Sequence, residues 1–211
     1  IKKFAPEPQW KYEFWDSKSL YEQCKLYSNK CATIFSSYKH MHQKMDLGRY
    51  VILYNLGGMY IDMDCEALKS FDTIPGLNFK DLIISETPTN FIENFITTGS
   101  CTTKLLNNGI ILSSKGNKFI KELIEEVLNV NCSSKFNPLY RNKQYCIFRS
   151  TGPLIFTRVL SKYKNNEKIL ILNHTYFEPC YSMDHFCKIS NNAIINHKHE
   201  LTWMNELLKY L

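Results

Sequence analysis

Apolar residues recur at two periods along the chain, and these periods predict helices that alternate with strands. The clearest helix is predicted after Asn117, because asparagine often caps a helix N-terminus. Its apolar positions share one helical face: Phe119, Ile120, Leu123, Ile124, Val127 and Leu128. Further helices are predicted at 19–27, 45–55 and 154–160, and the second should end at the Gly-Gly pair that follows it.

Short apolar or alternating runs predict the strands. They lie at 8–16, 59–61, 82–85, 109–113 and 168–172. Strands that alternate with helices favour an α/β layered fold with a mostly parallel central sheet. A chain of 211 residues can bury one sizeable core, so we expect a single domain over 1–211.

The composition excludes several classes of protein. With 44% hydrophobic and 22% charged residues the chain has the composition of a globular domain, and no apolar run approaches the roughly 20 residues that span a bilayer. The net charge is +6, but the lysines are scattered and no nucleic-acid-binding motif is present. We therefore expect no nucleic-acid partner, and membrane attachment only through a segment outside this chain.

The eight cysteines form no recognisable metal motif. No two are spaced as CxxC, and six residues separate Cys24 from Cys31 and Cys180 from Cys187, unlike the short spacing of a zinc knuckle. An even count permits disulfides without requiring them. The cysteines therefore leave both the disulfide state and the cellular compartment open.

Three acidic residues, Asp62, Asp64 and Glu66, follow the strand predicted at 59–61. In open α/β sheets, ligands bind at the carboxyl ends of strands. Asp62 and Asp64 would share one side of a continued strand, and a turn after Ile61 could equally gather them around one site. Carboxylates this close repel each other, and a divalent cation relieves the repulsion. Oxygen ligands favour Mg²⁺ or Mn²⁺ over zinc.

The residues around these acids resemble the signature of glycosyltransferase family 32. The matching positions are Asp46, Arg49, Tyr50, Leu53, Tyr54, Gly57, Gly58, Tyr60, Asp62 and Asp64. This family of DXD-motif sugar transferases includes fungal initiating α-1,6-mannosyltransferases and α-1,4-galactosyltransferases. The resemblance implies a GT-A fold, which is a single Rossmann-like domain. It also implies transfer of a sugar from a nucleoside diphosphate sugar to an acceptor hydroxyl, with retention of the anomeric configuration.

Weaker resemblance extends over most of the chain. Segments 8–16, 107–109 and 151–153 are similar to family segments, and 197–203 is similar to the closing "HHWxxSW". The family usually opens with a strand that reads like "IPKIIHQ" and helps to hold the nucleotide base. The sequence begins after the place of that strand, so we expect a domain that lacks it. Either the sequence is truncated or the strand has been lost, and a lost strand would weaken nucleotide binding.

The resemblance assigns a metal site. Asp64 is the expected direct ligand of Mn²⁺ or Mg²⁺, and His197 is expected to join it from the C-terminal part of the chain. Asp62 would contact the ribose, the sugar or, through water, the metal. Trp203 would cover the phosphates, and Asn108 would lie beside the reacting centre. Without the resemblance, His197 would be taken for an ordinary surface or core histidine.

The resemblance also assigns donor contacts. Asp46 and Arg49 would hydrogen-bond the donor sugar, although three residues apart on a helix they could equally form a surface ion pair. Tyr60 would pack either on the nucleotide or in the core. Glu86, after the strand 82–85, would lie in the acceptor cleft.

The expected partners are a UDP- or GDP-sugar and an acceptor that is a glycan, a lipid or a protein. The compartment would be the Golgi or ER lumen if the natural protein has an N-terminal anchor, and the cytoplasm if it is bacterial or viral. Two other functions compete with sugar transfer. One is an inactive module of the same fold that binds a nucleotide sugar or a glycan, and the other is a metal-dependent phosphohydrolase.

Overall fold

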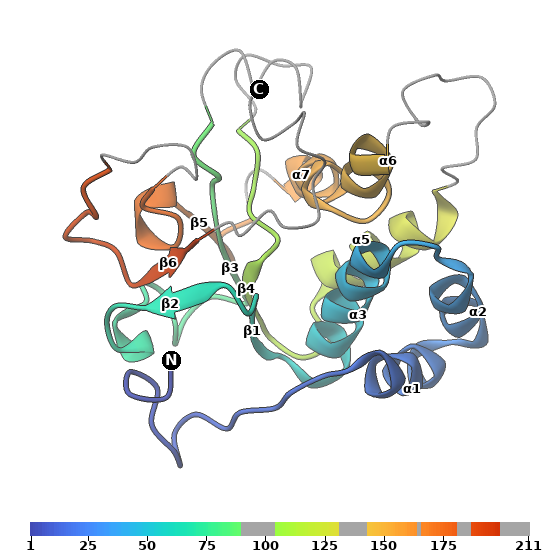
Figure 1. Ribbon diagram of the computed structural model, residues 1–211, viewed down its shortest axis with the longest axis horizontal. Coiled ribbons are helices and arrows are strands. Elements are labelled where there is room, and N and C mark those ends of the chain that lie inside the picture. Colours follow the sequence, from blue (N-terminus) through green and yellow to red (C-terminus); the bar gives the residue numbers. More distant parts are fainter. Residues whose placement is uncertain (90–103, 131–142, 164–165, 181–186, 199–211) are drawn as a thin grey trace.

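The computed structural model describes residues 1–89, 104–130, 143–163, 166–180 and 187–198 (Figure 1). Helices cover one face of a four-stranded sheet, and a two-stranded sheet packs on its other face. The α-helices are α1 Ser17–Tyr27, α2 Asn29–Ser37, α3 Met41–Leu56, α5 Lys118–Asn129, α6 Lys143–Ser150 and α7 Pro153–Leu160. The strands are β1 Gly58–Ile61, β2 Cys65–Ala67, β3 Leu82–Ser85, β4 Ile110–Ser113, β5 Ile169–Leu172 and β6 Ile195–His197.

Local signals place the ends of the helices. Asp16 caps α1, because its carboxylate accepts the backbone N–H of Ser19 at 2.7 Å. Asn117 caps α5 in the same way, as predicted. Helix α3 ends at Gly57, whose φ of 74° suits glycine best. The helices predicted at 19–27, 45–55 and 154–160 are confirmed.

The larger sheet has the strand order β1-β4-β3-β5, and its direction differs from the expectation. β4 runs antiparallel to both β1 and β3, and only β3 and β5 are parallel. The prediction of a mostly parallel sheet is therefore wrong, and the sheet is mixed. Alternation of strands and helices in a sequence does not set strand direction, because a parallel pair also needs a crossover that returns the chain to the same end of the sheet.

Other sequence predictions also need correction. Residues 8–16 form no strand, because Trp10 and Tyr12 pack as loop residues on the second core and Asp16 is used as a helix cap. Helices α2 and α6 and strands β2 and β6 were not predicted. These elements are short, and each is stabilised by its neighbours more than by a pattern of its own.

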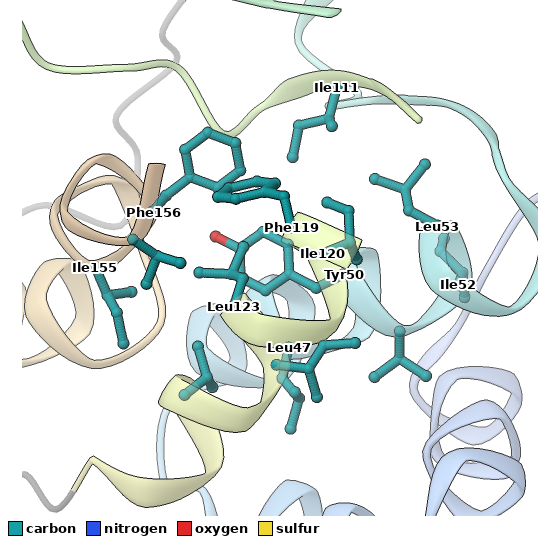
Figure 2. Packing of buried hydrophobic residues seen from close by; sticks show 14 of the residues in the cluster. Leu47, Tyr50, Ile52, Leu53, Ile111, Phe119, Ile120, Leu123, Ile155 and Phe156 are labelled. Atoms are coloured by element: carbon teal, nitrogen blue, oxygen red, sulfur yellow. The ribbon is translucent and has the colours of Figure 1, made fainter. Parts of the chain in front are cut away.

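Two hydrophobic cores lie on the two faces of the larger sheet. The first packs the helices on the sheet around Tyr50, Phe119 and Phe156 (Figure 2). The second packs the sheet against β2, β6 and the loops near them, with Phe71 and Phe177 fully buried. Among the described residues, no helix is both long and apolar enough to cross a membrane. The carboxyl end of β1, the first strand in the order of the larger sheet, leads into the polar residues described next.

Candidate functional site

The acidic residues lie where β1 ends and β4 begins. Ile61 pairs with Ile110, and the backbone N–H of Asp62 donates to the carbonyl of Gly109 at 2.9 Å. After Ile61 the chain turns at 62–64 and enters β2, so Asp62 and Asp64 are not on a continued strand. β2 pairs with β6, which sets Cys65 opposite His197. The C-terminal strand thus brings His197 to the acids.

His197 lies between the two aspartates. Its Nε2 is 3.2 Å from Asp64 Oδ1 and 3.9 Å from Asp62 Oδ2. Cys65 was not predicted, but ligand atoms of Asp64, Cys65 and His197 all lie within 4.8 Å of one another. Burial, followed by the charges of Asp62 and Asp64, raises the pKa of the Cys65 thiol, so the thiol stays protonated. Asp64 and His197 are the two members of this group whose ligand types suit Mn²⁺ or Mg²⁺.

Gly109 approaches two of these side chains closely. A Cβ added there would collide with Asp62 Oδ2 and would lie 3.0 Å from His197 Cε1. Any side chain at this position would therefore displace Asp62 or His197. The ligand types fit a divalent cation such as Mn²⁺, which binds carboxylate and imidazole groups.

The Arg49 side chain contacts three segments of the chain next to the acidic residues. Its buried guanidinium lies 3.2 Å from Asp62 Oδ1 and 3.3 Å from Asp46 Oδ1, and it donates to the carbonyl of Asn108 at 2.7 Å. It also stacks 4.5 Å from the ring centre of Tyr60, whose hydroxyl donates to Asp62 at 2.7 Å. The predicted ion pair of Asp46 with Arg49 therefore exists, but it is buried rather than on the surface. Its contact with a donor sugar stays a prediction.

Asn107 and Asn108 point in different directions. The Asn108 amide donates to Asp46 at 3.1 Å and to the hydroxyl of Tyr50 at 3.0 Å, so it braces the residues behind the site. The Asn107 amide instead lies 3.3 Å from His197 Nδ1. The role predicted for Asn108 beside the reacting centre stays a prediction, and Asn107 is the asparagine that reaches the histidine.

Glu178 is a site residue that the sequence did not reveal. Only 1% of it is exposed, and its Oε1 lies 3.2 Å from His197 Nδ1. Burial acts to lower the pKa of His197, but the hydrogen bond and charge of Glu178, with the charges of Asp64 and Asp62, outweigh it and raise the pKa. No motif surrounds Glu178, so only the folded chain shows its role.

The remaining predicted residues lie apart. Trp203 falls outside the described residues. Glu66 is about half exposed and pairs with Lys198 at 3.1 Å, away from the cation ligands. Glu86 follows β3 and pairs with Lys104 at 2.7 Å beside a cavity of about 410 Å³. Its place in an acceptor cleft stays a prediction.

Carboxylates and an imidazole at a strand end are ligand types that can hold a divalent cation. Comparison with known proteins gives a family match. Residues 3–80 match the family model described as "Glycosyltransferase sugar-binding region containing DXD motif". The chain is 27% identical over 158 residues to inositol phosphoceramide mannosyltransferase 1 of Schizosaccharomyces pombe, covering 74% of this chain and 42% of that protein.

Two further matches come from a virus and from a solved structure. The uncharacterized glycosyltransferase L373 of Acanthamoeba polyphaga mimivirus is 26% identical over 174 residues, which cover 81% of this chain and 60% of that protein. A structure titled "PaToxG Glycosyltransferase" aligns with a TM-score of 0.39 and 19% identity over 70% of this chain and 41% of that chain.

These matches confirm the resemblance to the DXD-motif sugar transferases: the chain is related to them, and Asp62 and Asp64 lie inside the matched region. The chain spans about 42 to 60% of the length of the two relatives. The family model covers Asp46, Arg49 and Tyr60, which are expected to contact the donor, but it does not reach His197 or Glu178. His197 therefore rests on the motif resemblance and on the geometry, and Glu178 rests on the geometry alone.

Proposed function

We propose that this chain is a metal-dependent, retaining glycosyltransferase with a GT-A fold, which moves a sugar from a nucleoside diphosphate sugar to an acceptor hydroxyl. One observation carries the proposal. Inside the DXD region at the end of β1, Asp64 Oδ1 lies 3.2 Å from His197 Nε2, which a separate part of the chain supplies. An ordinary acidic turn has no reason to be paired with a largely buried histidine.

The site residues suit the charge changes of this reaction. Asp64 and His197 would hold Mn²⁺ or Mg²⁺, and such a cation stabilises the negative charge that builds on the diphosphate as the glycosidic bond breaks. Arg49 neutralises Asp62 from behind, because its guanidinium is 3.2 Å from that carboxylate. Asp62 is thereby held at the strand end, where the resemblance implies contact with the ribose or the sugar.

The named relatives suggest the first substrates to test. The fungal relative is named for mannosyl transfer to inositol phosphoceramide. We therefore propose a nucleoside diphosphate mannose as the first donor and a lipid-linked hydroxyl as the first acceptor. Other UDP- and GDP-sugars, and glycan or protein acceptors, complete the panel.

The test measures release of nucleoside diphosphate from each donor by the full-length protein, with Mn²⁺ and with a chelator. We expect release from one donor only when Mn²⁺ is present, and a loss of about 100-fold or more in Asp64→Asn, because a catalytic cation loses a ligand. Glu66→Gln is the matched control, since Glu66 lies two residues on and pairs with Lys198. It should keep its activity within about two-fold.

Three results would contradict the proposal. If Asp64→Asn released as much nucleoside diphosphate as the wild type, the metal site would have no part in the reaction. Metal-dependent release of inorganic phosphate without sugar transfer would indicate a phosphohydrolase. Binding of the donor without turnover on any acceptor would indicate a binding module. An inverted anomeric centre, seen by NMR of the product, would contradict retention alone.

A further inference from the structure

We propose that Glu178 is a positioning residue for His197: its carboxylate holds the ring in the orientation and tautomer that present the lone pair of Nε2 to the cation. The inference rests on the proposed metal site of Asp64 and His197. It adds a residue outside the region that the family model matches. The carboxylate would act on the metal only through the imidazole.

The contacts of the imidazole set up this role. Glu178 Oε1 is 3.2 Å from Nδ1, and Asp64 Oδ1 is 3.2 Å from Nε2. The ring therefore lies between two carboxylates, one buried and one at the site. Histidines that bind metals commonly donate their second ring N–H to a carboxylate, which orients the ring and makes the ligating nitrogen more basic.

The backbone holds Glu178 and His197 in register. The backbone N–H of His197 donates to the carbonyl of Phe177 at 3.2 Å, and that of Ile194 donates to Tyr176 at 2.9 Å. The N–H of Glu178 donates to the carbonyl of His174 at 2.7 Å. These bonds fix the segment around Glu178 beside β6. The fold thus sets the backbones of Glu178 and His197 side by side, within reach of each other's side chains.

Burying the Glu178 carboxylate costs free energy unless the carboxylate has such a role. An ionised carboxylate with 1% exposure loses nearly all of its hydration. A buried charge persists in proteins when it is paired or hydrogen-bonded, and the His197 ring supplies an N–H donor. A neutral glutamine would fill the same volume at a smaller cost of desolvation. The contact with His197 thus lets a buried carboxylate act on the imidazole as a hydrogen-bond acceptor.

Asn107 makes the choice of tautomer testable. Its Oδ1 accepts the backbone N–H of Ile110 at 2.9 Å, which directs its NH₂ group toward His197 Nδ1 at 3.3 Å. As a donor, this NH₂ favours a bare Nδ1, which puts the proton on Nε2 and blocks a cation. Glu178 favours a protonated Nδ1 and a free Nε2. On the Nδ1 side the charge-assisted hydrogen bond of Glu178 is stronger than the contact with the Asn107 amide. Asp64, 3.2 Å from Nε2, favours a proton on Nε2 when no cation is bound, so Glu178 is the group that shifts the proton to Nδ1.

The experiment measures Mn²⁺ affinity by calorimetry, without donor sugar, for the wild type, Asp64→Asn, Glu178→Gln and the control Glu122→Gln. We expect Glu178→Gln to weaken Mn²⁺ binding about 10- to 100-fold. Glu122→Gln changes a carboxylate on α5 that is paired with Lys162, and it should bind like the wild type. NMR of the ring nitrogens, at a pH where His197 is neutral, should show a shift from the Nδ1–H to the Nε2–H tautomer in Glu178→Gln.

A second variant returns the charge from the other side of the ring. In Glu178→Gln with Asn107→Asp, a carboxylate replaces the NH₂ that faces Nδ1, while its other oxygen keeps the backbone donors. We expect this double variant to regain much of the Mn²⁺ affinity and the Nδ1–H tautomer, whereas loss of packing alone would not be rescued.

The outcomes separate the inference from the proposed function. If Asp64→Asn loses Mn²⁺ while Glu178→Gln keeps wild-type affinity and tautomer, the positioning role is wrong and the metal site stands. If the wild type binds no Mn²⁺, or Asp64→Asn binds it equally well, both are wrong. A Glu178→Gln protein with weaker binding but an unchanged tautomer would also overturn the positioning role.

Discussion

At the scale of single residues, the two aspartates of the motif have different surroundings. Asp62 receives the guanidinium of Arg49 at 3.2 Å and the hydroxyl of Tyr60 at 2.7 Å. Asp64 instead faces the imidazole of His197 at 3.2 Å. Since Asp62 is already neutralised from within the protein, Asp64 is the carboxylate better suited to bind a cation. This difference supports the assignment of Asp64 as the direct ligand.

Gly109 provides a test of the space beside these residues. In Gly109→Ala the new Cβ collides with Asp62 Oδ2 and crowds His197 Cε1 at 3.0 Å, so the site must shift. We expect a loss of about 1–3 kcal/mol in the free energy of unfolding, measured in urea, together with weaker Mn²⁺ binding.

Gly48→Ala is the matched control for this substitution. Gly48 lies in the interior of α3. The added Cβ would meet the end of the Leu20 side chain at 2.8 Å. A flexible side chain can move, and alanine also favours the helix by about 1 kcal/mol. Mn²⁺ affinity should stay at the wild-type value in Gly48→Ala. Equal losses of affinity in both variants would mean that the effect comes from general destabilisation.

At the scale of elements, a cluster of charges ties α5 to the end of α7. Lys162 Nζ lies 2.7 Å from Glu122 and 2.9 Å from Glu126, and the hydroxyl of Tyr163 donates to Glu122 at 2.7 Å. The charged groups are partly exposed to solvent, so each pair contributes little by itself. The hydrogen bonds from Lys162 and then Tyr163 lower the pKa of Glu122. The link between these helices should therefore depend on pH.

The expected pH dependence follows from the direction of that shift. A carboxylate whose pKa is lowered on folding adds stability above its unfolded pKa, and the added stability is lost as the pH falls through the folded pKa. Lys162→Met should therefore lower the melting temperature at neutral pH, and the difference from the wild type should shrink in acid. Lys121→Met is the control, because Lys121 lies on α5 beside Glu122. A constant difference at every pH would contradict the ionic origin.

At the scale of the whole molecule, the site rests on the first core. The Tyr50 ring stacks 6.0 Å from that of Phe156, and its hydroxyl donates to the carbonyl of Thr151 at 2.7 Å and accepts from Asn108 at 3.0 Å. One residue thus joins the packed aromatic cluster in Figure 2 to the polar residues behind the acids. Changes in this cluster should reach the site through Tyr50.

Phe156→Ala tests the contribution of this cluster. Phe156 is fully buried and also packs edge-on against Phe119 at 5.3 Å. Its removal should lower the free energy of unfolding by about 3–5 kcal/mol, measured in urea, because a cavity replaces the ring. Phe14, which is 82% exposed, provides the control, and Phe14→Ala should change stability by less than about 0.5 kcal/mol. Similar losses in both variants would contradict the assignment of the core.

The sequence by itself determined the features that depend on neighbouring residues. Asn117 and the Gly-Gly pair predicted helix ends, because capping and a positive φ are local requirements. The residues from Asp46 to Asp64 carried the family resemblance and predicted the acidic end of β1. They could do so because the helix, the turn and the strand lie within one short segment. These inferences needed no knowledge of which segments meet in space.

The tertiary structure alone decided the features that depend on distant segments. The mixed direction of the sheet follows from how β4 enters between β1 and β3, which helix and strand periods do not encode. The pairing of β2 with β6 brought His197 to Asp64, and the bonds beside β6 placed Glu178 behind it. Glu178 and Cys65 carry no local signal. Their places near His197 arise from burial and from contacts that only folding creates, the Glu178 side chain at Nδ1 and Cys65 opposite His197 in the pair of β2 and β6.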